Sequence, residues 1–176
     1  VEIQKSNILL LGPTGSGKTE SFRALSRMLD TPFYAQDASR LTSAGYVGDD
    51  VEDILRGLMQ AANGDVTKAE WGIVLLDEFD KLARKSGRSA SGYRDVSGEG
   101  AQQGLLKAIE GTRLPVTRGM GKSASVSFVG PDGTVKSNVD ILDTTNILFV
   151  CAGSFSGIED IVSQRVNQKA RLGFGS

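Results

Sequence analysis

Histidine is absent from this 176-residue sequence, and cysteine occurs once, as Cys151. These absences exclude zinc sites built from histidine and cysteine, Ser–His and Cys–His nucleophile pairs, and an intramolecular disulfide framework. No apolar run approaches the roughly 20 residues that a membrane-spanning helix requires. The formal net charge is −1, so there is no basic excess to attract nucleic acid or a membrane surface. We therefore expect neither partner.

The two ends of the sequence give a further expectation. The first residues, VEIQKSN, have none of the features of a signal or transit peptide. The sequence has no initial methionine and stops in the glycine-rich stretch RLGFGS. Its length is enough for one domain with a hydrophobic core. We expect a fragment of a longer protein.

Short apolar segments alternate with segments of helical periodicity. The first, at 7–12, is continuously apolar, which is typical of a parallel strand buried on both faces. Residues 82–98 are rich in serine, glycine and arginine, which predicts a loop. The alternation predicts an α/β fold with a mostly parallel sheet between two layers of helices. The predicted strands are 7–12, 31–38, 71–81 and 145–153, and the predicted helices are 18–29, 48–63, 99–111 and 157–166.

The stretch 112–143 interrupts this alternation. SASVSFV and TVKSNVDIL each alternate apolar and polar residues, and they flank GPDG, which is a turn signal. The pattern predicts a β-hairpin inserted into the α/β fold.

The segment LLLGPTGSGKTE (9–20) satisfies the phosphate-binding pattern G-x-x-x-x-G-K-[ST] between a predicted strand and a predicted helix. Glycines let backbone N–H groups approach phosphate oxygens, aided by the helix N-terminus. Lys18 is expected to reach the β- and γ-phosphates, and the Thr19 hydroxyl to bind Mg²⁺. The alternative is a glycine-rich turn that matches by chance. The predicted phosphate-binding residues are Gly12, Pro13, Thr14, Gly15, Ser16, Gly17, Lys18 and Thr19.

Two acids follow the apolar run at 73–76. Asp77 is expected at the carboxyl end of a buried strand, where open parallel sheets place their ligands, and it suits the role of holding Mg²⁺. Glu78 follows at once and points differently, so it can polarise the attacking water. This pair favours an ATPase over a kinase or a small GTPase. The alternative is a pair of solvated loop acids.

Two glycine-hinged loops precede predicted helices. AGYVGDD places Tyr46 and Val47 between glycines, where a large aromatic side chain is a candidate for gripping another molecule. RDVSGEGAQQ (94–103) is the second loop. Ordinary loop packing and a plain linker are the alternatives for these segments.

Six segments together resemble the ClpX family of AAA+ unfoldases, which feed the ClpP peptidase. They are GPTGSGKT, LTSAGYVGDDVED, GIVLLDEFDKLARKS, RDVSGEGAQQGLLKAIEGT, DTTNILFVCAG and LGFG, in this order and spacing. The resemblance covers nearly the whole chain except the predicted hairpin. It implies a P-loop AAA+ three-layer αβα sandwich, with residues 1–176 forming an incomplete large ATPase subdomain. The family's zinc-binding N-terminal domain and its small C-terminal domain are absent from the sequence.

The resemblance implies two pore loops. Tyr46 and Val47 correspond to the loop that grips an unfolding polypeptide in the axial channel of a homo-hexamer. Arg94 and Glu99 lie in the segment that corresponds to the second pore loop. The implied substrates are unfolded or tagged proteins.

The resemblance also implies a docking tripeptide and a nucleotide sensor. Leu172, Gly173 and Phe174 correspond to the residues that dock onto ClpP, and Ser154 lies near the sensor 1 position. The implied cofactors are ATP and Mg²⁺, with Lys18 and Glu78 as catalytic residues. No nucleic acid and no membrane are implied.

The sequence departs from the family pattern in two respects. The predicted hairpin carries Arg118 and Lys122 but not the Arg-Lys-His triplet that bacterial members use to recognise tagged substrates, so substrate preference stays open. The family's arginine finger and sensor 2 arginine lie beyond the last residue. DTTNILFV and QKARLGFG are closer to mitochondrial members, which favours the mitochondrial matrix; a bacterial-type cytoplasm is the alternative.

The leading hypothesis is therefore the ATP-hydrolysing core of a ClpX-like unfoldase. One alternative is an HslU-like or other AAA+ remodeller that never meets ClpP. Two further alternatives are an ATP-binding scaffold without turnover and a nucleic-acid motor. The acids at 77–78 disfavour the scaffold, and the near-neutral charge disfavours the motor.

Overall fold

A computed structural model of the chain describes residues 5–41, 47–85, 96–118, 128–129, 135–136 and 138–171. Its centre is a parallel sheet in the strand order β1-β8-β3-β2. The strands are β1 (Ile8–Leu11), β2 (Phe33–Asp37), β3 (Ile73–Asp77) and β8 (Leu148–Gly153). The predicted parallel sheet is confirmed.

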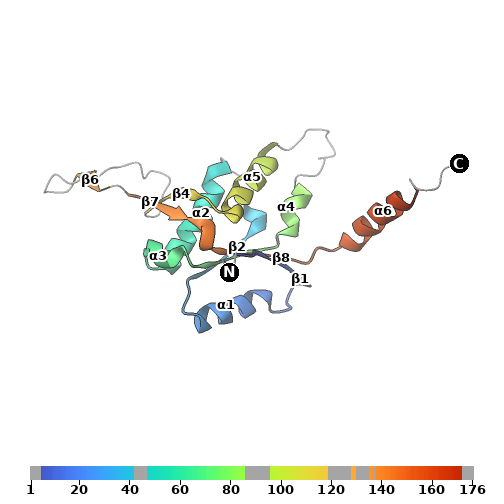
Figure 1. Cartoon of the computed structure of the whole chain (residues 1–176), viewed down its shortest axis with the longest axis horizontal. Coiled ribbons are helices and arrows are strands. Elements are labelled where there is room, and N and C mark those ends of the chain that lie inside the picture. Colours follow the sequence, from blue (N-terminus) through green and yellow to red (C-terminus); the bar gives the residue numbers. More distant parts are fainter. Residues whose placement is uncertain are drawn as a thin grey trace, which may run out of the picture.

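Helices lie on both faces of this sheet (Figure 1). One face carries α1 (Lys18–Met28), and the other carries α2 (Val47–Ala61), α4 (Asp80–Lys85) and α5 (Val96–Glu110). The three-layer prediction is therefore confirmed. The remaining helical elements are α3 (Val66–Ala69), η1 (Ala38–Arg40), η2 (Thr144–Asn146) and α6 (Ile158–Arg171), and α6 extends away from the sheet in Figure 1.

The alternation of side chains along β3 divides the hydrophobic core into two clusters. Val74 and Leu76 pack in the larger cluster with α2 and α5, whereas Ile73 and Leu75 pack in a smaller cluster with Phe22 of α1. Successive strand residues point to opposite faces, so a strand covered by helices on both sides must be apolar throughout. This requirement explains the continuous apolar run before Asp77.

The helical periodicity of 48–63 is confirmed by α2. The five apolar residues that carry this periodicity are all buried: Val51, Ile54, Leu55, Leu58 and Met59. The helix also lies unusually close to β2 at one point. A Cβ atom added at Gly57 would stand 2.3 Å from the Tyr34 ring. Glycine at this position therefore sets the spacing between α2 and β2.

Replacing Gly57 with alanine is expected to destabilise the fold. Alanine would gain about 1 kcal/mol of helix propensity, but forcing a methyl group against the Tyr34 ring costs about 1–3 kcal/mol. We expect a net loss of stability on urea denaturation. In a Tyr34→Ala background the same change should instead stabilise, because the obstructing ring is gone. Equal effects in both backgrounds would contradict this account.

The prediction that 7–12 is buried on both faces is wrong. The strand forms, but Leu9 is 58% exposed and Leu11 is 53% exposed. Among the residues of β1, only Leu10 packs against a core cluster. β1 pairs with β8 alone in the described part of the chain, so it is an edge strand there. An apolar run predicts a strand buried on both faces only when other elements pack against each face of that strand.

The predicted loop at 82–98 is also wrong at both ends. α4 occupies Asp80–Lys85 and α5 begins at Val96, so only the middle of the predicted loop, residues 86–95, lies outside the described residues. Ser97 and Gly98, two of the residues that suggested a loop, lie in the first turn of α5. The end of α5 is as predicted, because Gly111 adopts a φ of +107° and its N–H bonds the Lys107 carbonyl.

The inserted hairpin is confirmed, with a different division of its strands. β5 (Phe128–Val129) pairs antiparallel with β6 (Val135–Lys136), on either side of the GPDG sequence. The second half of TVKSNVDIL pairs elsewhere, because β7 (Val139–Asp143) runs antiparallel to β4 (Arg113–Thr117). The base of the insertion is therefore a separate two-stranded ladder.

The base of the insertion is joined to α2 by a polar cluster. Glu52 accepts hydrogen bonds from the Thr117 backbone N–H at 3.0 Å, from the Thr117 hydroxyl, and from Arg56 at 2.9 Å. Burial opposes ionisation of Glu52, but these hydrogen bonds outweigh it and lower the pKa of the carboxyl group. Glu52 thus holds the inserted strands against the helix.

Cys151 is buried in β8, and desolvation raises the pKa of its thiol to about 11, so it is an apolar core residue at neutral pH. None of the described helices has the length and apolar character needed to cross a membrane.

Candidate functional site

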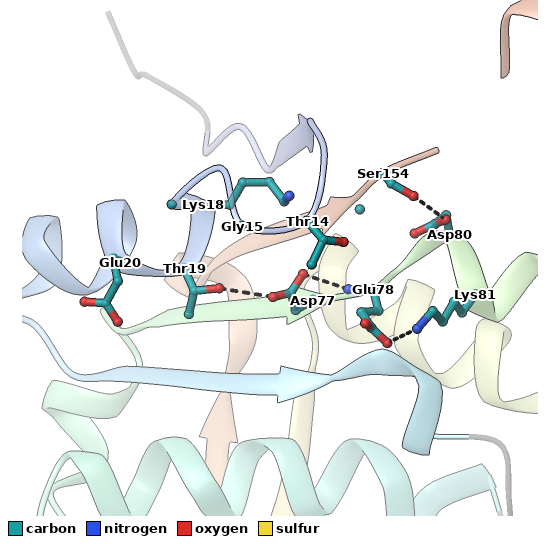
Figure 2. A pocket seen from close by; sticks show the side chains of 12 residues that line it. Thr14, Gly15, Lys18, Thr19, Glu20, Asp77, Glu78, Asp80, Lys81 and Ser154 are labelled. Atoms are coloured by element: carbon teal, nitrogen blue, oxygen red, sulfur yellow. Dashed lines mark hydrogen bonds and ion pairs between the residues drawn. The ribbon is translucent and has the colours of Figure 1, made fainter. Parts of the chain in front are cut away.

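A cavity of about 370 Å³ lies at the carboxyl ends of β1, β3 and β8 (Figure 2). This is the edge where open parallel sheets place their ligands. The residues come from the glycine-rich loop, from the end of β3 with α4, and from the end of β8. They are Thr14, Gly15, Gly17, Lys18, Thr19, Glu20, Asp77, Glu78, Asp80, Lys81, Gly153 and Ser154.

The glycine-rich loop is a tight turn between β1 and α1. Gly15 and Gly17 have φ angles of +81° and +82°, which favour glycine because it has no Cβ. The Gly12 N–H donates to the Gly153 carbonyl at 3.1 Å, so the start of the loop is tied to the end of β8. α1 begins directly after Gly17, at Lys18. The unpaired N–H groups of the first helical turn therefore face the cavity side of the loop.

Lys18 is held within the same loop. Its ammonium donates to the carbonyl oxygens of Gly12 at 2.8 Å and Pro13 at 2.7 Å. A compact ammonium group beside a glycine-rich loop is suited to bind an anion with several oxygens. Phosphate oxygens would replace these carbonyls as acceptors for the lysine.

Thr19 and Asp77 meet across the cavity. The Thr19 hydroxyl donates to an Asp77 carboxylate oxygen at 3.1 Å, although the two residues are 58 positions apart. A hydroxyl and a carboxylate are hard oxygen ligands of the kind that Mg²⁺ prefers, and Mg²⁺ commonly completes its shell with water and substrate phosphates. Within the described residues no group of three His, Cys, Asp or Glu side chains could hold a metal alone. The donor set therefore fits a magnesium ion that arrives with a phosphate ligand.

Asp77 and Glu78 point in different directions, as their positions at the end of a strand predict. Glu78 has a φ of +53°, an uncommon conformation for a residue with a side chain, and its N–H donates to an Asp77 carboxylate oxygen at 2.8 Å. Asp77 faces Thr19, whereas the Glu78 carboxylate is directed toward Lys81, with which it forms an ion pair (Figure 2).

The sequence did not reveal every residue of the cavity. The predicted strand at 71–81 is wrong at its end, because β3 stops at Asp77 and Asp80 and Lys81 belong to α4; Gly153 ends β8. A Cβ atom at Gly153 would lie 2.5 Å from an Asp80 carboxylate oxygen, so a larger residue at this position would require the Asp80 side chain to move. Opposite charges three residues apart at Glu78 and Lys81 were the sequence signal of their pairing, although Glu78 itself precedes α4.

Ser154 lies in the cavity, as its proposed sensor role requires. Its hydroxyl donates to the Asp80 carboxylate at 3.2 Å (Figure 2). The assignment of this serine as a nucleotide sensor stays a prediction.

Most of the predicted pore-loop and docking residues lie outside the described part of the chain. Tyr46 and Arg94 lie outside the described residues, as do the three residues of the docking tripeptide, Leu172, Gly173 and Phe174. Val47 and Glu99 are described in their backbones alone. Val47 is the first residue of α2, and Glu99 lies in the first turn of α5. The segment predicted to be the second pore loop is thus helical from Val96 onward.

A glycine-rich loop between a parallel strand and a helix, facing acids at the end of a neighbouring strand, defines a P-loop nucleotide-binding protein. The chain belongs to the AAA domain family (Cdc48 subfamily), whose model matches residues 3–173. Its fold and the contact between Thr19 and Asp77 agree with this membership.

Similar proteins carry the name of the family that the sequence resembles. A protein of Treponema denticola named "ATP-dependent Clp protease ATP-binding subunit ClpX" is 53% identical over 100% of this chain. Proteins with the same name from Porphyromonas gingivalis and Azotobacter vinelandii are 51% and 47% identical over 96% of the chain. The chain spans 36–40% of the length of these relatives. The resemblance to ClpX is confirmed across the whole chain.

Proposed function

We propose that this chain is the ATP-binding and ATP-hydrolysing core of a ClpX-like protein unfoldase. The observation that carries the proposal is the hydrogen bond between Thr19 and Asp77, with Glu78 one residue further on. It brings together the hydroxyl of a phosphate-binding loop, an acid suited to Mg²⁺ and an acid suited to activating water. The names of the three bacterial relatives support the same function.

Each residue has a distinct part in hydrolysis. The loop N–H groups and Lys18 bind and orient the triphosphate. Thr19 and Asp77 would hold Mg²⁺, which neutralises charge on the phosphate oxygens when bound. Glu78 orients the attacking water and accepts its proton. Ser154, whose hydroxyl donates to the Asp80 carboxylate, would act as the nucleotide sensor.

The partners are proposed from the same resemblance. A homo-hexamer would bring the Tyr46 loops of several subunits around one channel, where unfolded or tagged proteins would be gripped. Leu172, Gly173 and Phe174 would dock onto ClpP. For the compartment we propose the mitochondrial matrix, with a bacterial-type cytoplasm as the alternative; the bacterial source of the three relatives gives no support to the first.

The coupling to ClpP is tested by Phe174→Ala in the full-length protein. We expect degradation of a tagged fluorescent substrate by added ClpP to fall by about 10-fold or more, since truncating a buried aromatic anchor at an interface costs about 2 kcal/mol or more. ATP hydrolysis stimulated by an unfolded protein should stay unchanged, because Phe174 is remote in sequence from the phosphate-binding loop.

Other outcomes would identify a different protein. Undiminished degradation by the Phe174→Ala variant would exclude this docking residue, and a wild-type protein that ignores ClpP would favour a remodeller of the HslU type. Stimulation of hydrolysis by DNA but not by unfolded protein would indicate a nucleic-acid motor.

A further inference from the structure

The first half of α2 is hydrogen-bonded to the base of the insertion through Glu52. Its carboxylate accepts from the Thr117 backbone N–H at 3.0 Å, from the Thr117 hydroxyl, and from the Arg56 guanidinium at 2.9 Å. Arg56 also donates to the Thr117 hydroxyl at 3.2 Å. Because Thr117 ends β4, this cluster joins the end of one inserted strand to one turn of the helix.

Apolar packing alone does not fix how the β4–β7 ladder sits on α2. Val116 of β4 is buried in the larger core cluster, and Leu114 packs against it. Apolar attraction has no preferred direction. A cavity of about 330 Å³ also opens between the second half of α2 and the ladder, where it is lined by Gln60 of the helix and Asp140 of β7. Hydrogen bonds weaken steeply when they are bent, so the contacts of Glu52 set the position of the ladder along the helix.

Glu52 lies close to the start of α2. It is the sixth residue of the helix, about one and a half turns from Val47, which directly follows Tyr46 in the sequence. A helix is stiff over this distance, because its backbone N–H groups are bonded to carbonyls four residues back. Figure 1 shows β4 beside α2. A displacement of β4 would therefore be carried through Glu52 to Val47, the neighbour of Tyr46.

We propose that Glu52 is a positioning residue for the polypeptide-gripping loop. By holding Thr117, it makes the start of α2 and the base of the insertion move as one body, and this sets where Tyr46 and Val47 meet an unfolded polypeptide. The inference rests on the proposed unfoldase function. The Glu52 and Arg56 side chains are only 28% and 21% exposed, so water competes weakly for these contacts.

Glu52→Ala in the full-length protein tests this role. The measurement is ATP hydrolysis at increasing concentrations of casein, a natively unfolded protein. We expect the casein concentration that gives half-maximal stimulation to rise by about 3–10-fold, which is the effect of one lost hydrogen bond on an equilibrium. The maximal rate, the basal rate and the Kd for a non-hydrolysable ATP analogue should stay at the wild-type values, because Glu52 is not among the residues that line the nucleotide cavity.

Two substitutions at Thr117 test the contact from its other side. Thr117→Val keeps the shape of the side chain and removes the hydroxyl, so the half-maximal casein concentration should rise by about 2–5-fold, less than in Glu52→Ala because the backbone N–H still bonds Glu52. Thr117→Ser keeps the hydroxyl and should restore the wild-type value. The double variant of Glu52→Ala and Thr117→Val should equal Glu52→Ala, since both changes remove the same contact.

Glu70→Ala is the matched control. Glu70 also accepts a backbone N–H of the ladder, from Asp143 at 2.9 Å, but it directly follows α3 and is not part of α2. Its loss weakens the attachment of the ladder without removing a contact of α2. The half-maximal casein concentration should therefore stay at the wild-type value, while the Tm falls by about as much as in Glu52→Ala.

The remaining outcomes contradict the inference. An unchanged casein concentration in Glu52→Ala would show that Glu52 does not position the loop. An equal rise in Glu70→Ala would mean that attachment of the ladder alone matters, and a fall in the basal rate confined to Glu52→Ala would mean that Glu52 supports the nucleotide site instead. If casein does not stimulate hydrolysis by the wild type, the proposed unfoldase function is wrong and the inference fails with it.

Discussion

Replacing Glu78 with glutamine should lower the kcat of ATP hydrolysis by about 10²–10⁴-fold, the range attributed to a general base. The amide keeps the size of the side chain but cannot accept the proton of the attacking water. The affinity for ATP should be retained, because the phosphate-binding loop and the Thr19–Asp77 contact do not involve the Glu78 side chain. Phosphate release and the binding of a fluorescent ATP analogue measure the two quantities separately.

The matched control for this substitution is Glu110→Gln. Glu110 is an exposed residue at the end of α5, so the same chemical change there should leave hydrolysis and nucleotide affinity intact. Hydrolysis that survives Glu78→Gln would move the base to another residue. A loss of nucleotide affinity would show that Glu78 binds rather than activates.

Replacing Lys18 with methionine should weaken ATP binding by about 100-fold. A hydrogen bond to a charged group contributes about 1.5–3 kcal/mol, and Lys18 is expected to make more than one to the β- and γ-phosphates. Methionine keeps the length of the side chain and the helical start of α1. Equilibrium binding of a fluorescent ATP analogue measures the effect.

The position of Lys18 also requires a folding control. Its ammonium bonds the Gly12 and Pro13 carbonyls, so its removal also changes the loop itself. The Tm of Lys18→Met should stay close to that of the wild type, because a partly exposed loop contact contributes little to global stability. Lys107→Met, on the exposed side of α5, should preserve both the Tm and the affinity. Wild-type affinity in Lys18→Met would contradict the assignment of this lysine.

The phosphate-binding loop and the acids that end β3 could be predicted because each depends on residues that are close together in the sequence. The positive φ angles of Gly15 and Gly17 are available to glycine at little cost, and the pattern of residues around them marks the turn directly. The buried run before Asp77 marks a strand covered on both faces, and the carboxyl end of such a strand is where ligands bind. The prediction that Thr19 and Asp77 share one ion needed only these two facts.

Other features could not be predicted because they depend on which elements become neighbours. β1 has the same apolar pattern as β3, yet Leu9 and Leu11 are exposed because neither packs in a core cluster of the described residues. The residues of TVKSNVDIL are divided between two ladders because 113–117 offers a second strand for pairing. Alternation shows which residues share a face, but not which strand they pair with.

The amino-acid sequence by itself determined the class of this protein: a P-loop, two acids at a strand end and the order of motifs that marks the ClpX family. Only the tertiary structure decided how the site is assembled. The strand order places β8 between β1 and β3, which brings Ser154 to Asp80 and Gly153 to Gly12. Local backbone preferences act over a few residues, whereas strand order follows from burying apolar faces across the whole domain.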